Sequence, residues 1–151
     1  MMRAFAIGFG LAATAAPALA CDADSSGARA VAEGIVEADN ARDIGRVLGY
    51  YADDAVLMPP NEAPVAERAD IRKRYDALFE DFAPDIEARI DEVCVEGNLA
   101  FVRGHTGGWL VSRIGGRSRE LDDVYLMILR RAEGGWRIAR LMWHSAHGPA
   151  G

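Results

Sequence analysis

The sequence predicts a single-domain α+β fold in which three amino-terminal helices pack in the concavity of a curved antiparallel sheet. Before Pro84 the apolar residues recur at helical spacing, whereas after Pro84 they alternate with polar residues. Glycine-containing turns at 96–98, 115–116 and 134–135 divide this second half into strands. Helices followed by a long meander bury their apolar faces most simply when the sheet curls around the helices, which leaves a concave mouth.

Two helices are predicted near the amino terminus. One of the serines at 25–26 can cap the first helix, and Asp39-Asn40 breaks it. Asn40, with Asp43 three residues later, resembles a capping box that opens the second helix, which ends at Asp53-Asp54. The apolar stripes of the two helices are Ala28, Val31, Ala32, Ile35 and Val36, and then Ile44, Val47, Leu48 and Tyr51.

A short strand, a loop and a third helix complete the first half. The apolar run 55–58 is predicted as the strand, and it stops at Pro59-Pro60. Residues 59–66 hold three prolines and have no periodicity, so we expect a surface loop. The third helix is predicted from about 66 to 79, with Ile71, Tyr75, Leu78 and Phe79 on one side.

The second half predicts four antiparallel strands at about 85–96, 99–112, 118–131 and 135–146. Within the first of these strands the apolar phase slips by one residue between Ile90 and Val93. A slip of one residue turns the side chains to the other face, so we predict a β-bulge near Asp91-Glu92. Gly107-Gly108, inside the next strand, is interpreted as a bend of the curved sheet.

The two ends of the chain lie outside the predicted domain, which covers 28–146. Residues 1–20 have a positive start, an apolar run and a final Ala-Leu-Ala, which together are typical of a signal peptide. We therefore expect an exported protein, periplasmic or secreted. Residues 21–27 are expected to be a flexible amino terminus, and 147–151 a disordered tail.

Cys21 and Cys94 are the two cysteines of the chain. In an oxidising compartment they could pair, or Cys94 could remain a small buried apolar residue. Cys21 directly follows the expected cleavage site, so lipid attachment is an alternative to both. The usual lipid-attachment box prefers Leu three residues before the cysteine, whereas Leu19 stands two residues before it.

Charge and motifs exclude several classes of function. The formal net charge is −6 and the basic residues are scattered, so no nucleic-acid partner is expected. His144 and His147 have an H-x-x-H spacing that His105 could join, but on a strand the i and i+3 side chains point to opposite sides. We therefore expect no metal, and no cofactor, because the sequence also lacks a phosphate-binding glycine loop.

Three segments carry a resemblance to a known family. They are the run Tyr51-Ala52-Asp53-Asp54-Ala55-Val56-Leu57-Met58-Pro59-Pro60, then Ala69-Asp70-Ile71-Arg72, and Gly135-Trp136-Arg137-Ile138 through Trp143-His144-Ser145. In order and spacing they resemble the SnoaL-like group of the nuclear transport factor 2-like superfamily, and most closely its SgcJ/EcaC-type members. Such proteins often carry Gly where Glu67 stands and Asn where His144 stands. The resemblance implies a cone-shaped fold that hosts isomerases, cyclases, dehydratases, hydrolases and binding domains, so it does not choose a function.

The resemblance also allows a test for ketosteroid isomerase activity, which needs a carboxylate base and two hydrogen-bond donors. The positions that match the three catalytic groups are Pro59, Ile35 and Leu126 or Met127, and none of these side chains can act in that way. We therefore do not expect that activity. What the resemblance leaves is the wall of an apolar pocket, although Tyr51 and Tyr75 could equally be ordinary core residues. The expected pocket residues are Ile35, Tyr51, Leu57, Pro59, Tyr75, Trp109, Trp143 and His144.

His105 is the best candidate for acid–base chemistry. It shares an alternating strand face with Trp109, while Asp123 and Tyr125 share a face of the next strand. A contact between His105 and Asp123 across the two strands would make His105 a general base; otherwise His105 forms an ordinary hydrogen bond within the sheet.

Two functions from different classes follow from the sequence. The first is an exported protein that binds a small apolar or aromatic molecule without transforming it. The second is a SnoaL-like enzyme that uses His105, Asp123 and Tyr125. The resemblance also implies a homodimer formed through the outer face of the sheet, which exposed apolar residues on that face would support.

Overall fold

A computed structural model of the protein describes Cys21 and residues 24–146. The expected signal peptide and the expected tail at 147–151 lie outside the described residues. Three helices and five strands follow one another in the order α1, α2, β1, α3, β2, β3, β4, β5. Helix α1 begins at Ser26, so the last two residues of the expected flexible segment 21–27 belong to a helix.

The helices are α1 (Ser26–Asn40), α2 (Ile44–Tyr50) and α3 (Arg68–Asp81). Each lies close to its predicted position, but the cap of α2 is a different residue from the one expected. Asp43 is the N-cap, and its side chain accepts a hydrogen bond from the backbone N–H of Arg46 at 3.0 Å. Asn40 instead exchanges two hydrogen bonds, of 2.8 and 3.0 Å, with the backbone of Ile86. It therefore ties the end of α1 to the sheet.

The strands are β1 (Tyr51–Met58), β2 (Phe82–Glu96), β3 (Leu99–Ser112), β4 (Arg119–Ala132) and β5 (Gly135–Ser145). They form one sheet in the order β1-β5-β4-β3-β2. The predicted meander is confirmed as β2 to β5, and β1 adds a fifth strand that runs parallel to β5. The prediction that the second helix continues to Asp53-Asp54 is wrong, because the chain turns into β1 at Tyr51 and pairs there with Ile138.

The bulge that the sequence predicts in β2 is present. The pairing of β2 with β3 shifts register between Ile90 and Glu92, so Asp91 is the extra residue. Gly108 in β3 has a φ of 121°, a conformation that favours glycine, and its α-carbon faces the backbone of Asp85 and Ile86. Long, bent strands follow from these local irregularities.

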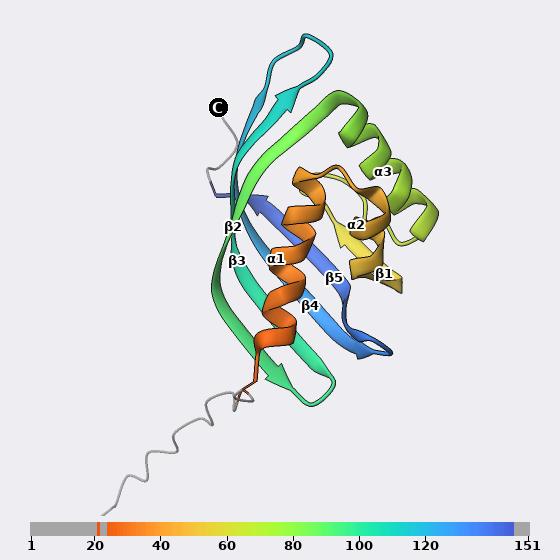
Figure 1. Ribbon diagram of the computed structural model, residues 1–151, viewed down its shortest axis with the longest axis vertical. Coiled ribbons are helices and arrows are strands. Elements are labelled where there is room, and N and C mark those ends of the chain that lie inside the picture. Colours follow the sequence, from red (N-terminus) through yellow and green to blue (C-terminus); the bar gives the residue numbers. More distant parts are fainter. Residues whose placement is uncertain (1–20, 22–23, 147–151) are drawn as a thin grey trace, which may run out of the picture.

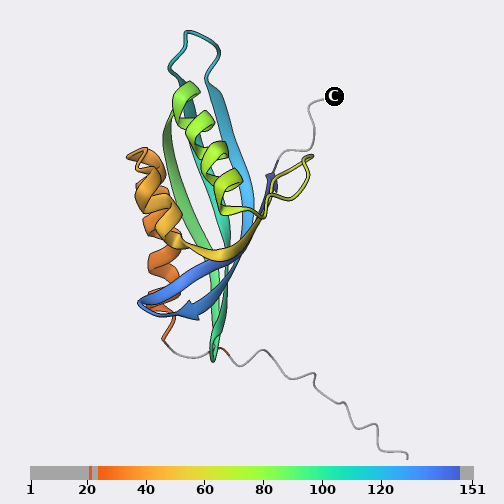
Figure 2. The same ribbon diagram turned by 90° about the vertical axis from the view of Figure 1, so that its right-hand side faces the viewer.

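The helices cover the concave side of the sheet, as Figures 1 and 2 show. Helix α1 runs along that side, and α3 lies toward the end where the β3–β4 hairpin projects. The core between these layers includes Ile35 of α1, Leu57 of β1 and Val102 of β3, all of them buried. The expected fold of three helices in a curved sheet is confirmed. Within the described part of the chain, no helix combines the length and apolar character needed to cross a membrane.

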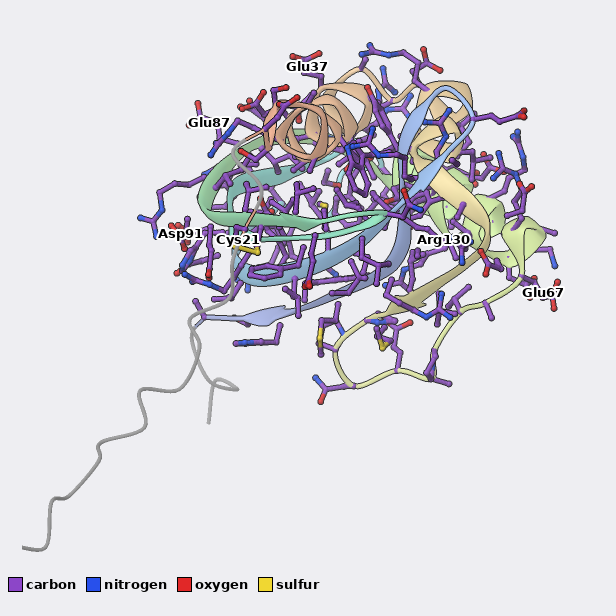
Figure 3. The ribbon with its side chains drawn as sticks, turned by 90° about the horizontal axis from the view of Figure 1, so that it is seen from below. Cys21, Glu37, Glu67, Glu87, Asp91 and Arg130 are labelled. Atoms are coloured by element: carbon purple, nitrogen blue, oxygen red, sulfur yellow. A yellow bond between two sulfur atoms is a disulfide. The ribbon has the colours of Figure 1, made fainter. Side chains whose placement is uncertain are left out.

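A disulfide joins Cys21 to Cys94, 73 residues apart in the sequence. Cys94 is buried and lies opposite Phe101, on the face of β2 that points away from the helices. Figure 3 shows the bond between the two sulfur atoms beside the sheet. The disulfide therefore fixes Cys21 to the outer face of the sheet.

Candidate functional site

A cavity of about 620 Å³ lies between helices α1 and α3 and the concave face of the sheet. This volume falls within the range of about 300–1,000 Å³ that small-molecule sites occupy. Helix α1, strand β1 and the sheet supply mostly apolar side chains, and α3 supplies both apolar and charged ones. The lining residues are Ile35, Val36, Asp39, Leu57, Lys73, Arg74, Tyr75, Ala77, Leu78, Asp81, Pro84, Ile86, Thr106, Leu110, Arg119, Leu121, Asp123, Tyr125, Met127, Leu141 and Trp143.

Aromatic side chains form one side of this cavity. The hydroxyl oxygens of Tyr51 and Tyr75 lie 2.8 Å apart and share a hydrogen bond. The ring of Tyr75 is tilted against the ring of Tyr51 at 6.2 Å and against Phe79 at 5.7 Å. Burial raises the pKa of both tyrosine hydroxyls, so they stay protonated at neutral pH. Of these three rings, that of Tyr75 lines the cavity, and the hydroxyl pair lies at its edge.

Asp39 brings a carboxyl group into the same cavity. It lies one turn of α1 beyond Ile35 and Val36, so the helix directs it to the face that they line. Its Oδ1 atom is out of contact with solvent and has no hydrogen-bond partner among the described residues. Burial raises the pKa of Asp39 from 3.8 to about 8, so the neutral acid is the main form at pH 7.

Asp39 was not among the residues expected at the site, because Asp39-Asn40 was interpreted only as a helix break. The signal was available, since position 39 continues the i+3 and i+4 spacing of the apolar stripe from Ile35 and Val36. A carboxyl group at a stripe position indicates a buried acid, and a buried acid is a candidate functional group.

Charged groups on α3 and β4 line the rest of the cavity. Arg74 makes two hydrogen bonds to Glu62, at 2.6 and 3.2 Å, and its guanidinium lies 5.7 Å from the centre of a Trp143 ring. Asp123 of β4 is partly buried, and this burial raises the pKa of its carboxyl while the nearby Arg119 lowers it. The cavity therefore holds a second carboxyl whose charged form is disfavoured.

Tyr125 lines the cavity beside Asp123 on the same strand. Its hydroxyl lies over Gly104 of the neighbouring β3, where a Cβ would come within 2.7 Å of the oxygen. Burial raises the pKa of Tyr125 to about 12. In the described part of the chain this buried hydroxyl has no hydrogen-bond partner.

His105 lies on the opposite, outer face of the sheet. In the pairing of β3 with β4 it stands opposite Val124, whereas Asp123 stands opposite Thr106 on the cavity side. The expected contact between His105 and Asp123 is therefore not formed. The Nε2 atom of His105 lies 3.2 Å from Asp91, the bulge residue of β2, which Figure 3 labels. His105 thus lacks the partner that would have made it a general base at the cavity.

A second hollow, of about 550 Å³, lies on this outer face. Its walls include His105, Trp109 and the glycines at 107–108, together with acidic residues of β2. Trp109 is exposed here and does not line the cavity under the helices. Trp109, which was expected to line the pocket, therefore lies on the outside of the sheet.

A family model for the SnoaL-like domain matches residues 32–141. The chain belongs to the SnoaL-like family. The match runs from the middle of α1 into β5, so it includes every residue that lines the cavity except Trp143. No curated protein matches the chain.

Solved structures agree with this SnoaL-like assignment. A ketosteroid isomerase-like protein from Erwinia carotovora is 27% identical, with a TM-score of 0.75 over 84% of this chain and 99% of that one. A proposed aromatic ring hydroxylase from Novosphingobium aromaticivorans is 22% identical, with a TM-score of 0.73 over 83% and 90% of the two chains. A proposed dehydratase of the NTF2-like family from Streptomyces avermitilis is 13% identical, with a TM-score of 0.70 over 81% and 95%. The last two likenesses concern the fold alone.

The structure brings together half of the expected pocket residues of this SnoaL-like domain. Ile35, Leu57, Tyr75 and Trp143 line the cavity, and Tyr51 reaches its edge through the hydrogen bond to Tyr75. Pro59, Trp109 and His144 do not line it. His144 is exposed, and its Nδ1 lies 2.9 Å from the backbone oxygen of Ser145.

The positions that match the catalytic groups of ketosteroid isomerase carry no acid–base group. Ile35 and Met127 line the cavity and are apolar, and Pro59 does not line it. Among residues 24–146 and Cys21, no group of three or more His, Cys, Asp or Glu side chains is placed to hold a metal ion. Asp39 and Asp123 are the lining carboxyls whose pKa is raised, and further polar groups of the wall are Lys73, Arg74, Tyr75, Asp81, Thr106 and Arg119.

Proposed function

We propose that this SnoaL-like protein binds a small apolar or aromatic molecule in the cavity between its helices and its sheet. One observation carries the proposal: about 620 Å³ of space is bordered mainly by aliphatic and aromatic side chains, with a few polar atoms at defined places. The aromatic rings of Tyr75, Tyr125 and Trp143 line this space and suit an aromatic ligand, because aromatic groups pack well edge to face.

A fluorescent apolar probe, 8-anilinonaphthalene-1-sulfonate, tests this proposal on the folded protein. Thr106 lines the cavity from the middle of β3, so Thr106→Phe fills part of the space, whereas Thr106→Val keeps the volume. We expect saturable dye binding by wild type and Thr106→Val, and at least tenfold weaker binding by Thr106→Phe. Equal binding by all three folded proteins would contradict the proposal.

An enzymatic function of this cavity is the alternative. It is supported by the two carboxyl groups with raised pKa, Asp39 and Asp123, and by the buried hydroxyl of Tyr125, since such groups gather at sites of acid–base chemistry. His105, which faces away from them, takes no part in this alternative. Native mass spectrometry of protein incubated with a cell extract distinguishes the two functions: an unchanged ligand supports binding, and a mass-shifted product supports catalysis.

We infer that the protein is exported, periplasmic or secreted, and that it belongs to the SgcJ/EcaC-type group of the family. The signal-like residues 1–20 and the Cys21–Cys94 disulfide support export, because structural disulfides persist in oxidising compartments. A lipid on Cys21 is the alternative, since lipid and disulfide need the same sulfur atom. The run from Tyr51 to Pro60 supports the finer family assignment. The mass of the peptide that contains Cys21, measured after expression of the full sequence, distinguishes the disulfide from the lipid.

We further propose a homodimer through the outer face of the sheet. Three large apolar residues of β3, Leu99, Trp109 and Val111, are 56%, 46% and 42% exposed, and Met142 of β5 is 45% exposed. Pairing of two such faces would bury these side chains. Light scattering is expected to give twice the chain mass for the wild type and the monomer mass for Trp109→Glu. A monomeric wild type at high concentration would refute the dimer.

A further inference from the structure

The carboxyl of Asp39 lines the cavity without a counter-ion. Buried polar atoms in proteins nearly always have a hydrogen-bond partner, because leaving one without a partner is costly. Within the described residues the Oδ1 atom of Asp39 has no such partner. Burial is what raises the pKa of this carboxyl to about 8, and no cation of the described residues offsets that effect. The carboxylate form of Asp39 therefore lacks a positive group that would stabilise it.

The basic groups of α3 do not supply this counter-ion, because each of them is already paired. Lys73 lies 2.7 Å from Asp70, and Arg74 makes two hydrogen bonds to Glu62, at 2.6 and 3.2 Å. Both acids lie outside the cavity lining, so the two pairs leave almost no net charge in the wall. These two basic side chains therefore do not keep a cation out of the cavity.

The other charges of the wall contain no positive excess either. Burial raises the pKa of Asp123, and the charge of Arg119 on the same strand lowers it. Asp81, in the last turn of α3, is a further acid of the wall. One basic group thus faces two acidic ones, so a ligand cation meets no net repulsion. Aromatic rings, which attract cations, line the same wall at Tyr75, Tyr125 and Trp143.

The position of Asp39 in α1 favours a cation as well. Helix α1 ends at Asn40, so Asp39 lies in its last turn. The carbonyl groups at the carboxyl end of a helix carry partial negative charge, which attracts a positive group and repels a negative one. The helix end and the unpaired carboxyl therefore act on a ligand in the same direction.

We propose that the cavity selects an aromatic or alicyclic molecule that carries a protonated amine, and that Asp39 is the counter-ion of this amine. The inference deepens the proposed function and rests on it. The apolar wall binds the ring system, and the ammonium group lies beside Asp39 at the end of α1. Asp39 loses its proton to the solvent when the ammonium arrives, because an adjacent cation stabilises the carboxylate. Binding of the amine therefore releases a proton.

The titratable groups that face Asp39 from other elements are Tyr51 of β1 and Tyr75 of α3, since its charge acts on both hydroxyls. Burial raises the pKa of the two tyrosines, so they stay protonated at neutral pH. Asp123 is the second lining carboxyl whose pKa is raised. A proton released on binding thus comes from Asp39 or from Asp123, and a variant of each distinguishes them.

Three probes with a naphthalene body test the selection by equilibrium dialysis at pH 7. They are 1-(2-naphthyl)ethylamine, which is a cation, 1-(2-naphthyl)ethanol, which is uncharged, and 2-isopropenylnaphthalene, a hydrocarbon of nearly the same shape. We expect the amine to bind the wild type about tenfold more tightly than the alcohol or the hydrocarbon, as one hydrogen bond between charged groups allows. Asp39→Asn keeps the shape of the site but does not ionise, so it should lose this preference and still bind the other two probes.

Titration calorimetry in two buffers of different ionisation enthalpy measures the released proton. At pH 7 the amine should release about one proton from the wild type, and none from Asp39→Asn. The alcohol should release none from either protein. From pH 6 to pH 8 the affinity of the wild type for the amine should rise by about tenfold or more, because less protonated Asp39 has to ionise. A merely structural role of Asp39 would change neither readout.

Two further variants locate the cation. Asp123→Asn removes the other carboxyl of the cavity and should still release the proton, whatever its affinity. Glu87→Gln removes an acid of the outer hollow, where Trp109 and other acidic residues lie, and should bind the amine as the wild type does. Loss of the proton in Asp123→Asn, or a loss of amine binding in Glu87→Gln equal to that in Asp39→Asn, would overturn Asp39 as the counter-ion.

The three probes also separate this inference from the proposed function. Equal affinity of the wild type for amine and alcohol, or a preference for the amine that persists in Asp39→Asn, would overturn the amine selection and leave the binding cavity intact. Failure of all three probes to bind would overturn the proposed function, and the selection with it.

Discussion

Asp39 occupies a helix position that an apolar residue would fill at lower cost in free energy. Its neighbours along the α1 stripe, Ile35 and Val36, line the same cavity. A carboxyl there keeps its proton up to about pH 8, whereas in the unfolded chain it loses the proton near its ordinary value of 3.8. A carboxyl that lowers the free energy of unfolding near neutral pH indicates a functional role that an apolar side chain cannot take.

Asp39→Asn is therefore expected to stabilise the protein, and the gain should depend on pH. Between about pH 4 and pH 8 the folded state holds a proton that the unfolded state has released, so the stability of the wild type falls as pH rises through this window and then levels off. Urea unfolding should show a gain for Asp39→Asn that grows by about 1.4 kcal/mol for each pH unit from near zero at pH 4 to several kcal/mol at pH 8.

Glu87→Gln serves as the control for this experiment, because Glu87 is exposed on the outside of β2. Its stability should follow the wild type at every pH. Parallel stability curves for Asp39→Asn and the wild type across the window would show that Asp39 is ionised in the folded protein, which contradicts its role as a neutral acid.

At the scale of residues, the sequence predicted much of the cavity wall, including Asp123 and Tyr125, but it placed His105 on the wrong face of the sheet and left out Asp39. Ile35, Leu57, Tyr75 and Trp143 were placed correctly because apolar periodicity and the family resemblance both mark them. His105 was misassigned because the pairing register decides which face a strand residue takes. Odd-numbered residues of β3 stand opposite even-numbered residues of β4, so His105 and Asp123 face opposite sides.

The bounds of helices and strands were predictable where the sequence pattern allowed one interpretation. The strands β2 to β5 begin and end within three residues of the prediction, since glycines mark their turns. Tyr51 was different, because it fits the helical stripe Ile44, Val47, Leu48 and also the start of a buried strand. Its pairing with Ile138 of β5, far away in the sequence, decides for the strand, and no local pattern contains that information.

The bulge at Asp91 gives a test at this scale. Asp91 lies within hydrogen-bond distance of Arg89 at 3.0 Å, Arg103 at 3.3 Å and His105 at 3.2 Å, on the exposed outer face. Because exposed ion pairs contribute little, Asp91→Ala should lower the free energy of unfolding by about 1 kcal/mol or less.

Deletion of Asp91 should also leave the pairing of β2 intact, because Ile90 and Glu92 already face the consecutive residues Gly104 and Arg103, so every side chain keeps its face. Urea unfolding of the two variants measures the effect. If deletion costs about 3 kcal/mol or more while alanine substitution does not, the bend that the extra residue gives to β2 is needed by the fold.

The disulfide gives a second test, since it holds Cys21 against the outer face of β2. Reduction should lower the free energy of unfolding by about 2–4 kcal/mol, as expected when a cross-link over a long loop is lost. A Cys21→Ser/Cys94→Ser protein should start at the lower stability and should not respond to dithiothreitol. Two free thiols in the unreduced, unfolded wild type would show that the bond is not formed.

The whole molecule is a curved sheet that keeps space between itself and three helices (Figures 1 and 2). The order of helices and strands, the bulge and the glycine bend predicted this shape, because a bent meander cannot pack flat against helices. The identity of the ligand did not follow from the same reasoning, since it depends on a few polar atoms whose orientation is set by packing. Asp39, Asp123 and Tyr125 carry those atoms.

Chemical-shift mapping by NMR tests the central claim most directly, because it locates a bound molecule on the folded protein. On addition of 2-isopropenylnaphthalene, the amides of cavity residues such as Ile35, Asp39 and Leu78 should shift in a saturable way. Amides around the outer hollow, at Ala88 and Gly107, should not move. Shifts confined to the outer hollow, or no shifts up to the solubility limit of the probe, would contradict binding in the cavity.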